Sequence, residues 1–157
     1  CNGHGTEEFL YGDKIGGKEE TLIAGENSKL FKGKIVYIRA CSTAAYLGKK
    51  IGKEDETTFI GYKVPLLFFT DQHYHGNPHN DATAKLFLEP TNLLVKYLII
   101  GKTAEEAVQQ HWDSYSKNLY AVLSNEKEPG SGALAAAIWS NMLALTLIGD
   151  PKKTIDN

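Results

Sequence analysis

The feature that most constrains the fold is an apolar run over residues 34–40 that ends at Cys41. A near-continuous apolar run of this length is typical of a strand that is buried on both faces. Residues 57–62 form a second strand-like run, and residues 42–51 between the two predict a helix. Because strand, helix and strand at this spacing form a βαβ unit, the sequence predicts an α/β fold with a mostly parallel sheet covered by helices.

Shorter patterns predict the elements around this unit. Residues 7–25 indicate a β-hairpin or meander that turns at Gly16-Gly17. Residues 26–33 predict a short helix capped by Asn27 or Ser28. Residues 63–83 predict a long irregular loop, and a loop of that length in a compact domain is usually functional or mobile.

The second half of the chain predicts three helices. The first covers residues 84–100, where Pro90 should break or restart the helix. The second opens on a capping box at residues 103–106. The third is the very apolar stretch 133–147. The apolar stripe expected on the second helix consists of Val108, Trp112, Tyr115, Leu119 and Val122.

Composition limits the classes of function. The chain has 157 residues, enough for one domain with a core, and its formal net charge of -2 gives no reason to expect nucleic acid or a membrane surface as a partner. No apolar run is long enough to span a bilayer, and no signal peptide is visible. The two cysteines do not suggest a disulfide scaffold, so we expect free thiols in the reducing cytoplasm.

Two short motifs carry the chemistry: His4-Gly5 and Ala40-Cys41 each stand where a strand is expected to end. A cysteine nucleophile needs a base within hydrogen-bond reach, and strand ends hold both groups rigidly. His4 would supply that base, and a helix beginning after Cys41 would favour the thiolate. The N–H groups of Gly5 and Cys41 would form an oxyanion hole.

These motifs resemble a known family. The chain is similar to the C-terminal part of the caspase-like (clan CD) cysteine peptidases, a group that includes caspases, gingipains, clostripain and separase, and it is most similar to the bacterial CHAT-domain type. The pieces that carry the resemblance are residues 2–6, 38–43, 59–62, 101–107 and 149–151.

The resemblance implies a fold and an activity. The fold would be a three-layer α/β sandwich, in which two strands with their helices, and the strand that carries His4, precede this chain. Residues 1–157 would then be the C-terminal portion of a single peptidase domain. The reaction would be peptide-bond hydrolysis through an acyl-enzyme, with His4 as base, Cys41 as nucleophile, and neither a third catalytic residue nor a cofactor. The partners would be a protein or peptide substrate, the upstream half of the domain, and a regulatory protein or sensor domain.

Substrate preference is predicted from Arg39. In the family, the residue two before the nucleophile often lines the substrate side-chain pocket, and strand alternation puts Arg39 on the same face as Cys41. A guanidinium there would favour an acidic side chain, unless Arg39 pairs with an acidic neighbour inside the protein. The loop over 63–83 would form another wall, where Asp71 or Asp81 would either neutralise Arg39 or select basic substrates.

Three alternatives remain open. Residues 71–81 contain three histidines and two aspartates, which resembles a metallohydrolase motif without its acidic position or final spacing, so we favour a solvated loop without metal. Cys1 would be the nucleophile in an N-terminal-nucleophile hydrolase. The chain would also serve as an inactive caspase-like scaffold if His4 and Cys41 were misplaced.

Overall fold

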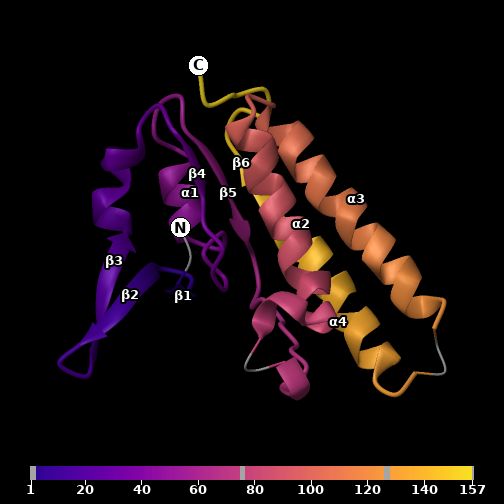
Figure 1. Ribbon diagram of the computed structural model, residues 1–157. Coiled ribbons are helices and arrows are strands. Elements are labelled where there is room, and N and C mark those ends of the chain that lie inside the picture. The colour runs from indigo at the N-terminus through magenta and orange to yellow at the C-terminus, as the bar shows by residue number, and fades with distance from the viewer. Residues whose placement is uncertain (1–2, 75–76, 126–127, 157) are drawn as a thin grey trace.

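The structure is a computed structural model that describes residues 3–74, 77–125 and 128–156. It has a mixed α/β architecture with two three-stranded sheets and, in these ranges, four α-helices (Figure 1). The strands are β1 (His4–Gly5), β2 (Phe9–Ile15), β3 (Lys18–Ala24), β4 (Ile35–Tyr37), β5 (Thr58–Tyr62) and β6 (Leu145–Ile148). The helices are α1 (Leu47–Ile51), α2 (Ala82–Ile99), α3 (Ala104–Leu123) and α4 (Ser131–Ala144), with 3-10 helices η1 (Gly25–Phe31), η2 (Gln72–Tyr74) and η3 (Pro78–Asn80). No described helix has both the length and the apolar character needed to cross a membrane.

The first sheet is an antiparallel meander in the order β1-β2-β3. The predicted hairpin is confirmed, because β2 and β3 pair across a turn in which Gly16 has φ 61° and Gly17 has φ 82°. Two successive positive φ angles suit glycine and match the twist of the flanking strands. The predicted helix at residues 26–33 is present as η1, but it begins after Ala24, whose N–H donates to the Asn27 side chain.

The second sheet has the order β4-β5-β6. Strands β4 and β5 are parallel, as the predicted βαβ unit requires, but β6 is antiparallel to β5, so the sheet is mixed and not mostly parallel. The difference arises within residues 133–147, which were expected to be helical throughout. Helix α4 ends at Ala144, and the extended backbone of Leu145 turns the chain directly back along β5.

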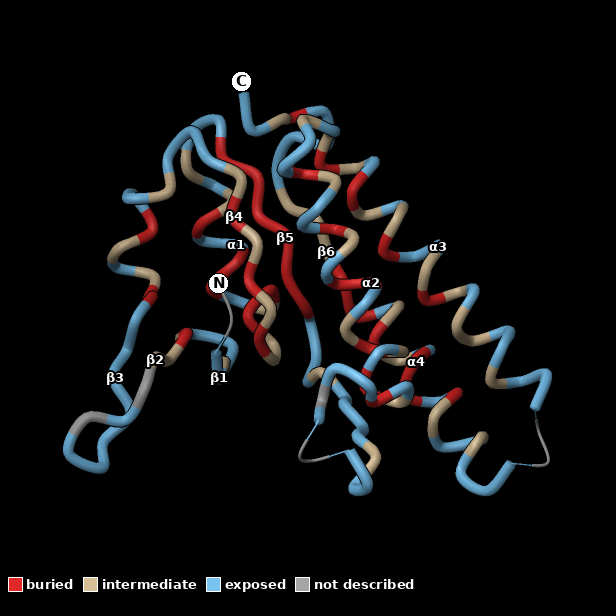
Figure 2. Tube along the Cα trace, in the orientation of Figure 1, coloured by how far each residue is buried: buried red, intermediate tan, exposed pale blue. Residues whose placement is uncertain are grey.

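Burial differs between the two parallel strands. Strand β5 is central and buried along its whole length, whereas β4 ends the sheet and alternates between buried and half-buried residues (Figure 2). The prediction that residues 34–40 are buried on both faces therefore holds in part for β4: Val36 is buried in the first core, while Ile35 and Tyr37 on the other face are half-buried against the second.

Layers cover both faces of the second sheet. Helix α1 and the β2–β3 hairpin lie on one side, and α2, α3 and α4 lie on the other (Figure 1). Strand β5 serves both cores, since Phe59 packs with the first layer while Ile60 and Tyr62 pack with the second. A third apolar cluster joins the three long helices around Phe87, Tyr115, Ala137 and Ile138.

Helix α2 continues through Pro90, so the predicted break does not occur. Proline lacks an N–H and leaves the carbonyl four residues earlier without its helical donor. That carbonyl belongs to Leu86, and the Asn118 side-chain amide of α3 donates to it at 2.9 Å. The Tyr115 hydroxyl also donates to the Phe87 carbonyl at 3.1 Å. Side chains from α3 therefore satisfy the region that proline disturbs.

Helix α3 begins where the sequence predicts. Thr103 and Glu106 form the capping box, with reciprocal side-chain-to-backbone hydrogen bonds of 3.3 and 2.9 Å. The buried stripe, however, includes His111 in place of the predicted Trp112, which is 42% exposed. His111 lies one helical turn before the fully buried Tyr115, so it shares that face of the helix.

Candidate active site

Strand β1 and the turn that carries Cys41 lie against each other. A Cβ atom added to Gly5 would lie 2.7 Å from the Cys41 carbonyl oxygen and 2.8 Å from both the Ala40 Cβ and the Thr43 Cγ2. Real Cβ atoms do not approach other atoms so closely, so only glycine permits this packing. The residue after His4 is thus in direct contact with the backbone of Cys41.

Backbone hydrogen bonds hold β1 in this position. His4 and Gly5 pair with Tyr11 and Leu10 of β2 in antiparallel register. The chain beyond β1 is fixed to the next layer, because the N–H of Leu47 at the start of α1 donates to the Glu7 carbonyl at 2.7 Å. The His4–Gly5 segment is therefore braced from two sides.

The Cys41 turn is anchored to the end of β5 and to the segment that follows it. Ser42 donates to the Val64 carbonyl at 3.3 Å, and Ala44 donates to the Tyr62 carbonyl at 3.0 Å. The helix predicted from residue 42 begins only at Leu47, because residues 41–46 form turns and Ser42 has a left-handed φ of 56°. The prediction that a helix beginning directly after Cys41 favours its thiolate is therefore wrong, because α1 begins only at Leu47.

Both groups of the predicted dyad are open to solvent. His4 is exposed, and Cys41 is half-buried with a free thiol. A nucleophile must be reachable by its substrate, and a thiol can react only while it is not held in a disulfide. The accessibility of His4 and Cys41 is what a cysteine hydrolase requires.

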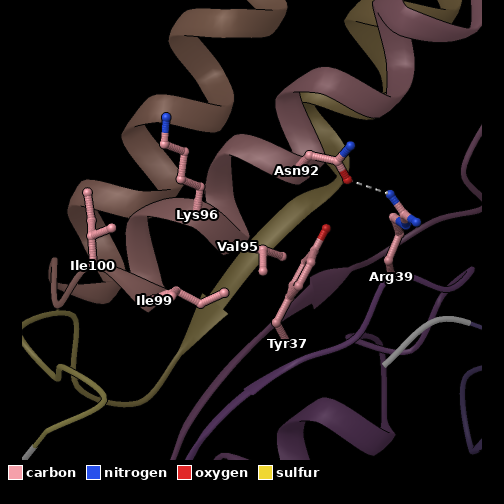
Figure 3. Close-up of a pocket in the computed structure, with 7 residues that line it drawn as sticks. All are labelled: Tyr37, Arg39, Asn92, Val95, Lys96, Ile99 and Ile100. Atoms are coloured by element: carbon pink, nitrogen blue, oxygen red, sulfur yellow. Dashed lines mark hydrogen bonds between the residues drawn. The ribbon is translucent and has the colours of Figure 1, made fainter. Parts of the chain in front are cut away.

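Arg39 lies between two cavities at the end of β4. Its Nη1 donates to the Thr91 hydroxyl at 2.8 Å. The same atom donates to the Asn92 side-chain oxygen at 3.3 Å, the hydrogen bond drawn in Figure 3. Thr91 in turn donates to the Leu88 carbonyl at 2.7 Å, so α2 fixes the orientation of the guanidinium. These two hydrogen bonds from Arg39 go to neutral groups and bring no opposite charge to it.

The smaller cavity, of about 210 Å³, is lined by mainly apolar side chains together with Arg39, Thr91, Tyr115 and Asn141. One wall is the extended segment 66–68, which buried Asn141 of α4 holds through a pair of hydrogen bonds to Leu67, 2.9 Å at the N–H and 2.6 Å at the carbonyl. Sequence reasoning missed Asn141. Its only signal was an amide within a stretch expected to be apolar and buried.

The two aspartates predicted near the pocket have defined partners in the loop. Asp81 is 2% exposed and is the N-cap of α2, accepting from the N–H groups of Ala84 and Asp71, both at 2.9 Å. Asp71 accepts from the N–H and ring Nδ1 of His73 at 2.9 and 2.8 Å. We therefore assign both carboxylates to the architecture of the loop, and their contact with a substrate stays a prediction.

The alternative nucleophile and the metal hypothesis involve residues outside the described ranges. Cys1 and His75 both lie outside them, whereas His73 and His79 are described and exposed. Within residues 3–74, 77–125 and 128–156, no group of three histidine, cysteine or acidic side chains is placed to hold a metal ion.

A buried network of hydrogen bonds runs from Tyr37, which lines the larger of the two cavities beside Arg39, into the helical layer. The Tyr37 hydroxyl lies 3.1 Å from that of Tyr62, which lies 3.3 Å from His111 Nε2. Burial raises the pKa of Tyr37 to about 12 and lowers the pKa of His111 to about 3. Burial also raises the pKa of Tyr62 well above its ordinary value, so all three groups are uncharged at neutral pH. Sequence reasoning missed this network, because its members are far apart in the chain.

No protein-family model, curated protein or solved structure matches this chain. The candidate site is therefore argued from its own geometry. The geometry combines a histidine-bearing strand end, a free cysteine on the adjacent turn, and an oriented guanidinium two residues before that cysteine.

Proposed function

We propose that this chain is the C-terminal, catalytic portion of a caspase-like cysteine peptidase domain, with His4 as general base and Cys41 as nucleophile. The observation that carries the proposal is the contact of Gly5 with the Cys41 backbone, because it joins the two motifs that the chemistry requires. The covering of the sheet on both faces is compatible with the three-layer sandwich of that family.

The proposed reaction uses His4 and Cys41 in turn. His4 takes the proton of the Cys41 thiol, and the sulfur attacks the substrate carbonyl to form a C–S bond. The N–H groups of Gly5 and Cys41 would donate to the oxyanion of the tetrahedral intermediate. His4 then returns the proton to the leaving amine as the C–N bond breaks. A water molecule, deprotonated by His4, hydrolyses the thioester and releases the acid product and the free thiol.

Arg39 would select the substrate. The smaller cavity opens beside the guanidinium, two residues before Cys41, and its walls are mainly apolar. A carboxylate can accept two parallel hydrogen bonds from guanidinium, so a substrate with an acidic side chain before the scissile bond is favoured. The upstream half of the domain and a regulatory partner would complete the enzyme.

An electrophilic peptide probe tests the proposal. We expect a peptidyl probe with aspartate before its reactive group to label Cys41, and to do so faster than the matching lysine probe, because Arg39 attracts the first and repels the second. Mass spectrometry of the labelled peptides identifies the site. Labelling of Cys1 would favour the N-terminal nucleophile, whereas no labelling at all would favour the scaffold.

Gly5→Ala is expected to damage the site directly. The new methyl group would lie 2.7–2.8 Å from the Cys41 carbonyl oxygen and two side-chain carbons, so the strand end and the cysteine turn must separate. Overpacking of this kind costs about 1–3 kcal/mol of folding stability, and a small displacement of catalytic groups can lower the rate about 100-fold. Probe labelling rates and urea unfolding measure the two effects.

Gly12→Ala on β2 is the matched control. A Cβ atom at Gly12 would meet only the Glu20 carbonyl oxygen, at 3.9 Å, which is ordinary contact. We expect this variant to label Cys41 at the rate of the unsubstituted chain. Equal rates for the Gly5 and Gly12 variants would contradict the assigned packing of His4 against the cysteine turn.

A further inference from the structure

Helix α4 carries no charge on any side, yet one of its sides is open to water. The sequence between Glu128 and Asp150 contains no charged residue, and a helix that is apolar all round is normally buried. The inner side of α4 packs on the other helices and the sheet through Ile138 and Ala144. The outer side is a row of exposed residues at steps of four, three and four along the helix: Gly132, Ala136, Trp139 and Leu143. An exposed apolar row of this kind marks a surface that binds another chain.

The adjoining side of α3 extends the row into a broader surface. The two helices lie side by side and run in opposite directions (Figure 1), and the Ser116 hydroxyl donates to the Met142 sulfur at 3.5 Å. On α3, Trp112 and Tyr120 stand one turn before and after Ser116 and are 42% and 72% exposed. We call this surface the α3–α4 face, and it consists of Trp112, Tyr120, Gly132, Ala136, Trp139 and Leu143. Both tryptophans of the chain therefore belong to it.

The row on α4 is complementary to itself in shape. Its first half is small, Gly132 and Ala136, and its second half is large, Trp139 and Leu143. A Cβ atom added to Gly132 would meet no described atom within 4 Å, so the space beside it is open. Two copies of α4 can pair antiparallel about a two-fold axis midway between residues 137 and 138. Trp139 of one copy then lies opposite Ala136 of the other, and Leu143 lies opposite Gly132, so large side chains meet small ones.

Charge and area both suit a second copy at this face. None of its six residues is charged, so pairing two copies brings no like charges together there. Trp112, Tyr120 and Trp139 are 42%, 72% and 51% exposed. Since an aromatic side chain buries about 150–250 Å², these three leave roughly 300 Å² of each copy open to water. With Leu143 and the small residues added, two copies would cover roughly 1,000 Å², which suits a reversible dimer at the small end of specific interfaces.

We infer that the α3–α4 face joins two copies of this chain in a two-fold dimer, in which α4 packs antiparallel against α4 of the second copy and Trp139 fills the space beside Ala136. Each copy supplies the same surface, so the assembly closes at two. The inference does not depend on catalysis by Cys41.

Sedimentation equilibrium of the 157-residue chain, under reducing conditions that prevent a disulfide between copies, tests the dimer. We expect a reversible monomer–dimer equilibrium, and tryptophan emission that shifts to longer wavelength as dilution separates the copies. Ala136→Glu should raise the dissociation constant at least tenfold, because it places two carboxylates near the two-fold axis. Ala136 is exposed and glutamate favours helix, so this variant should keep the circular dichroism of the folded chain. Ala121→Glu, at an exposed position of α3 outside the face, is the matched control and should leave association unchanged.

Mixing two variants tests the two-fold arrangement itself. The two copies of residue 136 would lie about 4.5 Å apart along the helix axes, since each is one and a half residues from the two-fold axis. A glutamate in one copy and a lysine in the other can therefore pair. At concentrations where the unsubstituted chain dimerises, we expect Ala136→Glu and Ala136→Lys chains to be monomeric separately and to form a heterodimer when mixed.

Three results would overturn the inference. They are a monomer at every concentration, association of the Ala136→Glu chain as tight as that of the unsubstituted chain, and a mixture of the Ala136→Glu and Ala136→Lys chains that stays monomeric. A chain that is always monomeric would assign the α3–α4 face to a different protein. Loss of association in the Ala121→Glu control equal to that in Ala136→Glu would likewise reject this face as the interface.

Discussion

Substitution of Cys41 with alanine is expected to reduce peptide hydrolysis by at least about 1,000-fold, because no other group replaces a covalent nucleophile. The fold should persist. Cys41 is half-buried and small, so loss of its sulfur should change the free energy of unfolding by no more than about 1 kcal/mol. Hydrolysis of an aspartyl peptide substrate and urea unfolding are the two measurements.

His4→Ala supplies the companion variant. Loss of a general base typically lowers the rate about 100-fold to 10,000-fold, and the exposed position of His4 predicts little effect on stability. The effects of the two substitutions should not add, because base and nucleophile act in one step. Full turnover in the Cys41→Ala variant would reject the proposed mechanism, even if the chain folds as described.

Acid is expected to destabilise the protein through His111. Its ordinary pKa is 6.5, and burial lowers the folded-state pKa to about 3. Between these values the unfolded chain binds a proton that the folded chain does not, so stability is complete above about pH 6.5 and falls as the pH drops toward 3. The slope for one such group approaches about 1.4 kcal/mol per pH unit.

His111→Phe isolates this contribution. The ring of His111 packs edge-on against Tyr115, with centroids 4.8 Å apart, and phenylalanine can keep that contact. Urea unfolding at pH 7, 5.5 and 4.5 should show a shallower loss of stability for His111→Phe than for the unsubstituted chain. His79→Gln, at an exposed histidine, should retain the original slope. Parallel slopes for all three chains would show that His111 is not buried in its neutral form.

Local patterns predicted the elements that depend on local chemistry. The turn at Gly16-Gly17 and the capping box of Thr103 and Glu106 each need only a few neighbouring residues, and both form as expected. The parallel pairing of β4 with β5 followed from the spacing of two apolar runs. These features are set by backbone geometry within a short stretch of chain.

Tertiary contacts decided the features that the patterns missed. Pro90 remains inside a helix because Asn118, twenty-eight positions later, supplies the hydrogen bond that proline removes. His111 lies on the buried face of α3, but the partner that accommodates its polar ring there is Tyr62, which is far away in the chain. The sequence did not reveal strand β6, because Leu145–Ile148 directly follows α4 and is as apolar as that helix.

The candidate site likewise combines features that local patterns predict with features that only tertiary contacts determine. The pairing of the His4 and Cys41 motifs was a hypothesis from residue type and strand ends, and the Gly5 contact supports it. The helix expected at Cys41 was wrong, because Ser42 adopts a left-handed φ that no residue of the motif signals. The sequence analysis missed the loop roles of Asp71 and Asp81, since Asp81 accepts from backbone N–H groups and Asp71 accepts from the backbone and ring of His73, and only the folded loop brings these groups together.

The hydrogen bonds that α3 donates to α2 near Pro90 also bear on the side chains that α2 places beside β4. Val95, Lys96 and Ile99 belong to the part of α2 that follows Pro90, and the hydrogen bonds from Asn118 and Tyr115 therefore help to set their position beside β4. A substitution at Asn118 or Tyr115 of α3 is thus expected to shift the side chains that line the cavity between α2 and Tyr37 without touching them. Side chains of α3 therefore influence the position of the second half of α2 through the turn that precedes Pro90.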